Sequence, residues 1–205
     1  LDKQGIAINF VGLVGHATVR SAVMGLDNRE PRDFELRKMK NLIDKSMKEG
    51  AFGMSSGLTY DPSCYATTSE LVELAKVVAK HKGIYVTHSR GITEAALQAT
   101  LEAIETGESA GVPVHISHNV PEIIAEKPTG RAAVNLSIID EARARGLDVT
   151  CDVYGYVAGS TYLRSMMPPW ANAGGDKALV RRLRSRRIRE KIKNETLREG
   201  SRGGG

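Results

Sequence analysis

Two histidines stand where two short apolar runs end, and histidine is a residue type that binds metal ions and moves protons. His88 ends the run 84–88 and His118 ends the run 114–118. In a parallel sheet, ligands collect at the carboxyl ends of the strands, which is where both histidines are expected. If the strands are neighbours, about 4.8 Å apart, both imidazoles reach one zinc ion at about 2.0–2.1 Å. Each histidine alone fits an ordinary strand end, but the repeated placement favours a metal site.

The residues that must position these histidines alternate between strand-like and helix-like patterns. Apolar runs predict strands at residues 6–14, 52–56, 84–88, 112–118 and 147–153. Helical patterns lie between them, with start signals at Asp33 and Thr67 and with glycines at the expected ends. This alternation predicts an α/β fold of about five βα units, a parallel sheet with helices outside it. Periodicity alone leaves a doubly wound sheet and a barrel open.

Two of the predicted helices have an apolar side that we expect to be buried. The helix that begins near Asp33 carries Phe34, Met39, Leu42, Ile43 and Met47 on one side. The helix that follows His88 carries Leu97, Leu101 and Ile104.

The composition is typical of a soluble globular protein, with 41% apolar and 26% charged residues in a chain of 205. No apolar run approaches the roughly 20 residues that span a bilayer, so we expect no membrane partner. The first residues lack the layout of a secretory signal. Cys64 and Cys151 are too few and too far apart for a disulfide framework, and a cytoplasmic location is expected.

The net charge of +5 is unevenly distributed. Residues 177–205 hold eleven Lys and Arg against three Glu, a balance of +8, whereas residues 1–176 have a balance of −3. Such a run suggests nucleic acid, but no aromatic residues alternate with it for base stacking and no binding module is recognisable. We therefore expect no nucleic-acid partner. The chain divides into βα units at 1–170, a basic helical segment at 171–200 and a disordered tail at 201–205.

Several blocks of the sequence resemble one known family, the N-acyl-D-amino-acid deacylases (D-aminoacylases) of the metal-dependent amidohydrolase superfamily. The blocks occur in order over about residues 5–198. They are NFVGLVGH at 9–16 with Arg20, GMSSGLTY at 53–60, YA at 65–66, TSEL at 68–71, YVTHSR at 85–90, VHISH at 114–118, DVYGY at 152–156, GST at 159–161 and PPW at 168–170.

The resemblance implies a (β/α)₈ barrel, of which this chain is similar to the third to seventh strands. It implies that His88 and His118 are zinc ligands on neighbouring strands, with His118 also a catalytic residue. Tyr60, Ser160 and Arg164 match positions that contact the substrate, an N-acyl-D-amino acid. The implied reaction is hydrolysis of a linear amide by a zinc-activated water.

Parts of the family's site have no counterpart here: a His-x-His pair, a metal-ligating cysteine and a proton-shuttling aspartate. Val120 also stands where the family carries a lysine. Zinc usually has three or four protein ligands, so we expect weak or absent metal occupancy and little deacylase activity from the isolated chain. Alternatives are a catalytically inactive fragment or paralogue that acts as a scaffold or assembly subunit, and another amidohydrolase specificity such as dihydroorotase-like ring opening.

Five units are too few to close a barrel of eight strands, so both outer strands would present unpaired backbone edges. We expect a homo-oligomer or a complementing chain to cover them.

The remaining polar candidates have structural interpretations. His16 is expected to make a hydrogen bond at a strand end, and His81 to lie at a helix C-terminus. His115 has the opposite strand parity from His118 and is expected to face the helices. Asp152 ends the last predicted strand, where a hydrogen bond within the sheet is expected. Both cysteines are expected to be buried structural thiols.

Overall fold

The computed structural model describes residues 5–91, 95–120, 130–156 and 158–198, so the predicted tail at 201–205 lies outside the described residues. The elements in chain order are β1 (Leu13–Gly15), α1 (His16–Met24), α2 (Asp33–Lys48), β2 (Gly53–Gly57), the 3₁₀ turn η1 (Ser63–Tyr65), α3 (Thr68–Lys80), β3 (Ile84–His88), α4 (Ala96–Ala110), β4 (Val114–Ile116), α5 (Arg131–Ala144), β5 (Val149–Cys151), the 3₁₀ turn η3 (Leu163–Met166), α6 (Pro169–Asn172), α7 (Asp176–Arg184) and α8 (Arg186–Arg198).

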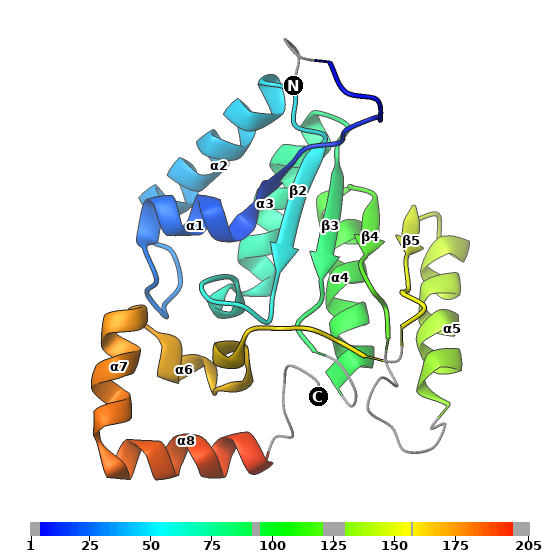
Figure 1. Cartoon of the computed structure of the whole chain (residues 1–205). Coiled ribbons are helices and arrows are strands. Elements are labelled where there is room, and N and C mark those ends of the chain that lie inside the picture. The colour runs from blue at the N-terminus through cyan, green and yellow to red at the C-terminus, as the bar shows by residue number, and fades with distance from the viewer. Residues whose placement is uncertain (1–4, 92–94, 121–129, 157, 199–205) are drawn as a thin grey trace.

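The five strands form one parallel sheet in the order β1-β2-β3-β4-β5, so each strand lies beside the next one in the chain (Figure 1). The predicted α/β fold of five βα units is confirmed. Because the strands are parallel, their carboxyl ends share one edge of the sheet. We call this edge, formed by the residues after Gly15, Gly57, His88, Ile116 and Cys151, the carboxyl rim. Within the described part of the chain, β1 and β5 are each paired along one side only.

Helices α2 to α5 pack on one face of the sheet, and alternate strand residues are buried against them. The strand residues of this core that are at most 1% exposed are Met54, Tyr85, Val114, Ile116 and Val149. The residues between them along each strand point to the opposite face. We call that opposite face the inner face, because a closed barrel would turn it inward.

The first predicted strand is wrong in its extent. β1 covers only Leu13–Gly15, and the apolar residues before it, Ile6, Ile8, Phe10 and Val11, are between 47% and 74% exposed. An apolar run predicts burial only where another element covers it, and no described element covers this one. The prediction for β3 matches its bounds, whereas β4 and β5 are the central parts of the longer runs predicted.

The predicted apolar side of α2 is narrower than expected. Three of its five residues are buried, but Phe34 is 44% and Leu42 is 37% exposed. At about 100° per residue, Phe34 stands opposite Ile43 on the helix and Leu42 stands to one side of it. Asp33 is the first helical residue rather than the N-cap, which is Arg32. In α4, Ile104 is buried whereas Leu101 is 43% exposed.

α1 begins directly after β1 and is not predicted by the sequence pattern. Its N-cap, Gly15, has no side chain to accept a hydrogen bond, and its first turn holds no acidic residue. The usual start signals of a helix are therefore absent. Val19 and Met24 of α1 are nevertheless buried in the main apolar core.

After β5 the chain crosses the carboxyl rim and continues into α6, α7 and α8 (Figure 1). The Tyr65 hydroxyl donates to the Pro169 carbonyl at 2.9 Å, and the Gly174 amide donates to the Leu26 carbonyl at 3.0 Å. The three helices bury a small apolar cluster of their own that includes Ile192. No helix among the described residues is long and apolar enough to cross a membrane.

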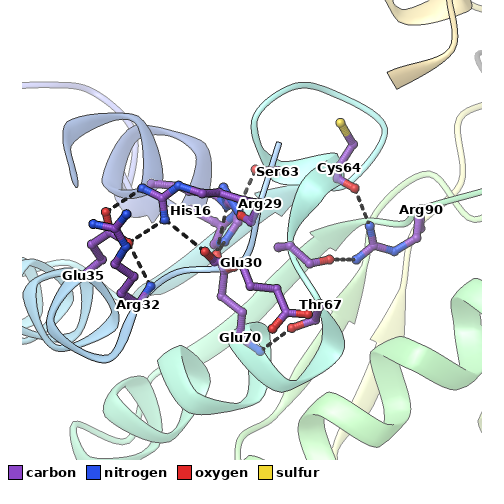
Figure 2. A network of polar contacts seen from close by, with 12 residues as sticks. His16, Arg29, Glu30, Arg32, Glu35, Ser63, Cys64, Thr67, Glu70 and Arg90 are labelled. Carbon is purple, nitrogen blue, oxygen red and sulfur yellow. Dashed lines mark hydrogen bonds and ion pairs between the residues drawn. The ribbon is translucent and has the colours of Figure 1, made fainter. Parts of the chain in front are cut away.

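A buried polar network fastens α1 to α3 at the carboxyl rim (Figure 2). His16 contacts Ser63 Oγ through Nδ1 at 2.7 Å and Glu70 Oε1 through Nε2 at 2.9 Å. Arg20 Nε donates to the same Glu70 oxygen at 3.1 Å. The side chains of His16 and Arg20 are fully buried and that of Glu70 is 1% exposed. The structural interpretation of His16 is confirmed, and so is the cap at Thr67, which accepts from the Glu70 amide.

The start of α2 contains a carboxylate whose ionisation should stabilise the fold. Arg29 donates two hydrogen bonds of 2.7 Å to Glu35, and the Arg32 amide donates a third of 2.8 Å (Figure 2). These bonds lower the pKa of Glu35 to about 2. The folded pKa lies below the unfolded value of about 4.3, so the stabilisation is complete above that value and is lost as the pH falls toward 2.

We therefore expect the stability difference between the wild type and Glu35→Gln to be constant near pH 7 and to shrink between about pH 4.5 and pH 2. Urea unfolding across that pH range measures it. Glu105→Gln, at an exposed position of α4, is the matched control and should show a much smaller pH-dependent difference. An unchanged difference down to pH 2.5 would contradict the prediction.

Candidate functional site

The structure brings His88 and His118 together at the carboxyl rim. Nδ1 of His88 lies 2.8 Å from Nε2 of His118, and the ring centroids are 4.5 Å apart at an interplanar angle of 72°. The two residues come from β3 and from the residues just after β4, which are neighbouring strands. The convergence expected from the sequence is observed. The role of the two rings as metal ligands stays a prediction.

The other side of the His88 ring is held by the loop after β2. Nε2 of His88 lies 2.7 Å from Thr59 Oγ1, and the Tyr60 ring centroid is 5.0 Å from that of His88. Burial, with a smaller contribution from the charge of His118, lowers the pKa of His88 to about 4. His88 is thus neutral at pH 7, which is the form that binds metal ions.

His118 reaches His88 only because the backbone departs from strand geometry. Continued alternation after Val114 and Ile116 would direct His118 toward the helices. Instead His118 has a φ of +38°, in the left-handed region that residues other than glycine rarely adopt. This turn places the ring beside His88.

The prediction that His115 faces the helices is wrong. In the sheet His115 pairs with Val86 and Thr150, and it lies on the inner face, because its neighbours Val114 and Ile116 occupy the helix face. The error came from extending strand parity through His118, where the left-handed φ breaks it.

Asp152 connects His115 to His118. Oδ2 of Asp152 lies 2.8 Å from His115 Nε2, and Oδ1 accepts a hydrogen bond from the His118 amide. These two interactions lower the pKa of Asp152 below its usual value. The predicted hydrogen bond of Asp152 within the sheet is confirmed.

The three predicted substrate-contacting residues lie in different surroundings. The Tyr60 hydroxyl is 3.2 Å from Thr161 Oγ1, next to exposed Ser160. Arg164 bridges two carboxylates, at 2.8 Å from Asp61 and 2.7 Å from Asp176. Tyr60 and the 160–161 segment therefore lie beside the histidine pair, whereas the Arg164 guanidinium already has two acidic partners.

The histidine pair fits part of a zinc site. Two imidazole nitrogens that bind one tetrahedral zinc ion stand about 3.3 Å apart, so a small opening of the 2.8 Å contact would admit the ion. The donor chemistry is suitable, since neutral imidazole is a preferred zinc ligand. Among the described residues, no group of three His, Cys, Asp or Glu side chains could hold a metal. His88 and His118 therefore supply two ligands of a candidate metal site.

Thr59, Thr161 and Asp61 are site neighbours that the sequence reasoning missed. Thr59 and Asp61 flank Tyr60, so their place in the loop after β2 was the only available signal. Thr161 lies in the GST block, where Ser160 was chosen instead.

The remaining predictions concern residues outside the site. His81 lies at the C-cap of α3, as expected, and its Nε2 is 2.8 Å from Asp44. Both cysteines are unpaired. Cys64 is half-buried, and burial followed by the charge of Asp61 raises its pKa to about 12, but Cys151 is exposed, so the expectation that it is buried is wrong. Cys151 ends β5, an edge strand that is paired only with β4 in the described sheet.

Several known proteins that are similar to this chain in sequence or structure deacylate N-acyl-D-amino acids, as their names say. A D-aminoacylase from Alcaligenes xylosoxydans xylosoxydans is 40% identical over 158 residues, which make up 77% of this chain and 32% of that protein. An N-acyl-D-glutamate deacylase from Bordetella bronchiseptica, complexed with zinc and a phosphonate inhibitor that mimics the tetrahedral intermediate, has a TM-score of 0.68 and 33% identity, over 76% of this chain and 32% of that one. A D-aminoacylase with a binuclear metal centre has a TM-score of 0.73 and 32% identity, over 94% of this chain and 43% of that one. No family model matches the chain.

The chain spans about a third of the length of the relatives that it matches in sequence. Its five parallel strands correspond to part of their barrel-type domain, in agreement with the ordered motif blocks. Over the third of their length that it spans, the chain is therefore related to the N-acyl-D-amino-acid deacylases.

Proposed function

We propose that this chain is part of a zinc-dependent hydrolase that deacylates N-acyl-D-amino acids, and that His88 and His118 are two of its metal ligands. The observation that carries the proposal is the 2.8 Å approach of His88 Nδ1 to His118 Nε2 at the carboxyl rim. The similarity to the deacylases supports the reaction class, and the zinc complex of the Bordetella relative supports the metal.

A zinc ion held there would activate water and polarise the amide carbonyl. The chain's own residues have positioning roles. His88 and His118 present two imidazole nitrogens to the ion, and Tyr60 lines the space beside His88. Ser160 and Arg164 are proposed to contact the substrate's carboxylate and side chain. Arg164 would then replace its contact with Asp61 or Asp176 by a contact with the substrate. Asp152, whose oxygens are both engaged, is not the group that moves the proton.

The chain is proposed to carry only part of the catalytic site, because two imidazoles are fewer ligands than zinc enzymes use. The one-sided pairing of β1 and β5 supports a homo-oligomer or a complementing chain that covers these edges. The unpaired Cys64 and Cys151 favour a reducing compartment such as the cytoplasm. The two-ligand site also favours the second candidate, an inactive paralogue that serves in assembly.

The experiment that tests the proposal is zinc titration of the purified chain against a chromophoric chelator. We expect one weakly bound zinc per chain, lost in both His88→Ala and His118→Ala. His81→Ala is the matched control, since His81 lies on α3 and contacts Asp44, away from the site. Zinc binding that both site substitutions leave unchanged would refute the proposal.

A hydrolysis assay on the same samples separates the enzyme from the assembly subunit. N-acetyl-D-glutamate and N-acetyl-D-methionine are the substrates, and their L-enantiomers are the controls. We expect little turnover from the chain alone. Rapid turnover of the D-enantiomers would show that two ligands from this chain suffice, and would overturn the partial-site interpretation.

The hydrogen bond from Thr59 predicts a measurable effect on the metal. Partners of the second ring nitrogen fix the orientation of a metal-binding histidine, and their loss typically costs 10–100-fold in affinity. Thr59→Val keeps the shape but removes the 2.7 Å contact to His88, so zinc affinity should fall by about tenfold. Thr106→Val is the control, because buried Thr106 bonds only the Glu102 carbonyl within α4. Equal affinities for Thr59→Val and the wild type would contradict the prediction.

A further inference from the structure

The unusual backbone of His118 needs a physical cause. A left-handed conformation is unfavourable for a residue other than glycine, so the surrounding structure must hold His118 there. The flanking amides are bonded on both sides. The Ser117 amide donates to the Thr87 carbonyl at 2.9 Å, and the Asn119 amide donates to the Asp152 carbonyl at 2.8 Å.

The remaining amide of the turn, that of His118 itself, is bonded by the Asp152 side chain through Oδ1. The Asp152 amide also donates to the Ile116 carbonyl at 3.2 Å. These contacts join the end of β5 to the residues that follow β4. Asp152 thus makes three of the hydrogen bonds that the structure describes for the turn that aims His118, through its amide, its carbonyl and its carboxylate.

The Asp152 carboxylate is itself held in place from the inner face. His115 Nε2 lies 2.8 Å from Oδ2, and His115 Nδ1 lies 2.8 Å from Thr150 Oγ1. Because the carboxylate can only accept, His115 donates to it through Nε2, while the Thr150 hydroxyl bonds Nδ1. The parallel register, which pairs His115 with Thr150, aligns this chain of hydrogen bonds.

We propose that Asp152, held by His115, is a positioning residue that keeps His118 in its left-handed conformation and so presents His118 Nε2 beside His88 Nδ1. The inference rests on the proposed function for its consequence, the binding of zinc. The orientation of the ring itself does not depend on that function. Asp152 acts through the backbone of His118 and touches neither the ion nor the substrate.

The first test measures ring orientation in the metal-free chain. In the wild type we expect a nuclear Overhauser contact between the rings of His88 and His118, whose centroids are 4.5 Å apart. Asp152→Ala should abolish this contact while the unfolding midpoint shows that the protein remains folded. Asp152→Asn should restore it, because the amide oxygen accepts from His118 and the amide nitrogen donates to His115 in its other tautomer.

The second test measures zinc affinity of the same variants by chelator competition. Asp152→Ala should bind zinc about 10–100-fold more weakly than the wild type, and Asp152→Asn should keep most of the affinity. Asp148→Ala is the matched control, since it removes an exposed carboxylate beside the same strand. It should leave both the ring contact and the affinity unchanged.

Each outcome decides the inference. A ring contact that survives in Asp152→Ala overturns it, and so does an equal loss in Asp148→Ala. If Asp152→Ala does not fold, His115→Ala is decisive, because freeing the carboxylate should weaken the ring contact and an unchanged contact overturns the inference. If even the wild type binds no zinc, the proposed function fails, but the ring contact still tests the positioning role.

Discussion

Replacing Glu70 with alanine is expected to lower the free energy of unfolding by about 3–5 kcal/mol, since it leaves two buried groups without their partner. Arg20 and His16 are fully buried, and both contact Oε1 of Glu70. After the substitution the Arg20 guanidinium would retain only the Arg29 carbonyl, at 2.6 Å, among the contacts described for it. A buried charge without its counter-charge is among the few single changes that destabilise a domain so strongly.

Urea unfolding of Glu70→Ala and Glu73→Ala tests this expectation. Both glutamates lie on α3, but Glu73 is 31% exposed and pairs with Lys40 near the surface. Surface ion pairs contribute about 0–1 kcal/mol, so the Glu73 variant should remain close to the wild type. Similar losses in the two variants would show that the buried network of Glu70 is not a special source of stability.

Gly53→Ala is expected to be at least as damaging, because a methyl group there has no space. A Cβ on Gly53 would lie 2.0 Å from the carbonyl oxygen of Ile84, on the neighbouring strand. The obstacle is backbone rather than a flexible side chain, so β2 and β3 would have to separate. These strands are central in the sheet and carry the loop of Thr59 and the ring of His88. We expect a loss of about 4 kcal/mol or more, or failure to fold.

Gly12→Ala provides the comparison. A Cβ on Gly12 would meet only the Phe10 ring, at 3.5 Å, which is an ordinary contact. A glycine-to-alanine change without strain is neutral or stabilises by about 0.4–1 kcal/mol. Thermal unfolding of both variants, followed by circular dichroism, measures the difference. A Gly53→Ala protein that unfolds near the wild-type temperature would contradict the packing of β2 against β3.

Local signals in the sequence predicted the elements that depend on local physics. The cap at Thr67 and the apolar run 84–88 are signals contained in a few consecutive residues. Both α3 and β3 begin where these signals indicate. α1 has no such signal and is held by burial of Val19 and by the Arg20 network. Elements that depend on distant partners in this way cannot be recognised from a short window of sequence.

In the candidate site, too, the sequence predicts some features of single residues and not others. The neighbouring placement of His88 and His118 follows from strand order, which βα alternation predicts. The directions of His115 and His118 do not follow, because the alternation of strand residues ends where His118 turns left-handed. The hydrogen bond from the His118 amide to Asp152 joins residues 34 apart in the chain, a separation that no periodic pattern encodes.

The contacts that close the carboxyl rim join residues about a hundred positions apart. Tyr60 meets Thr161, and Arg164 meets Asp61, at separations of 101 and 103 residues. A ribosome makes His88 and His118 before it makes Thr161 and Arg164, and contacts of high sequence separation form slowly. The nascent sheet therefore has its two histidines before it has the segment that crosses the carboxyl rim beside them.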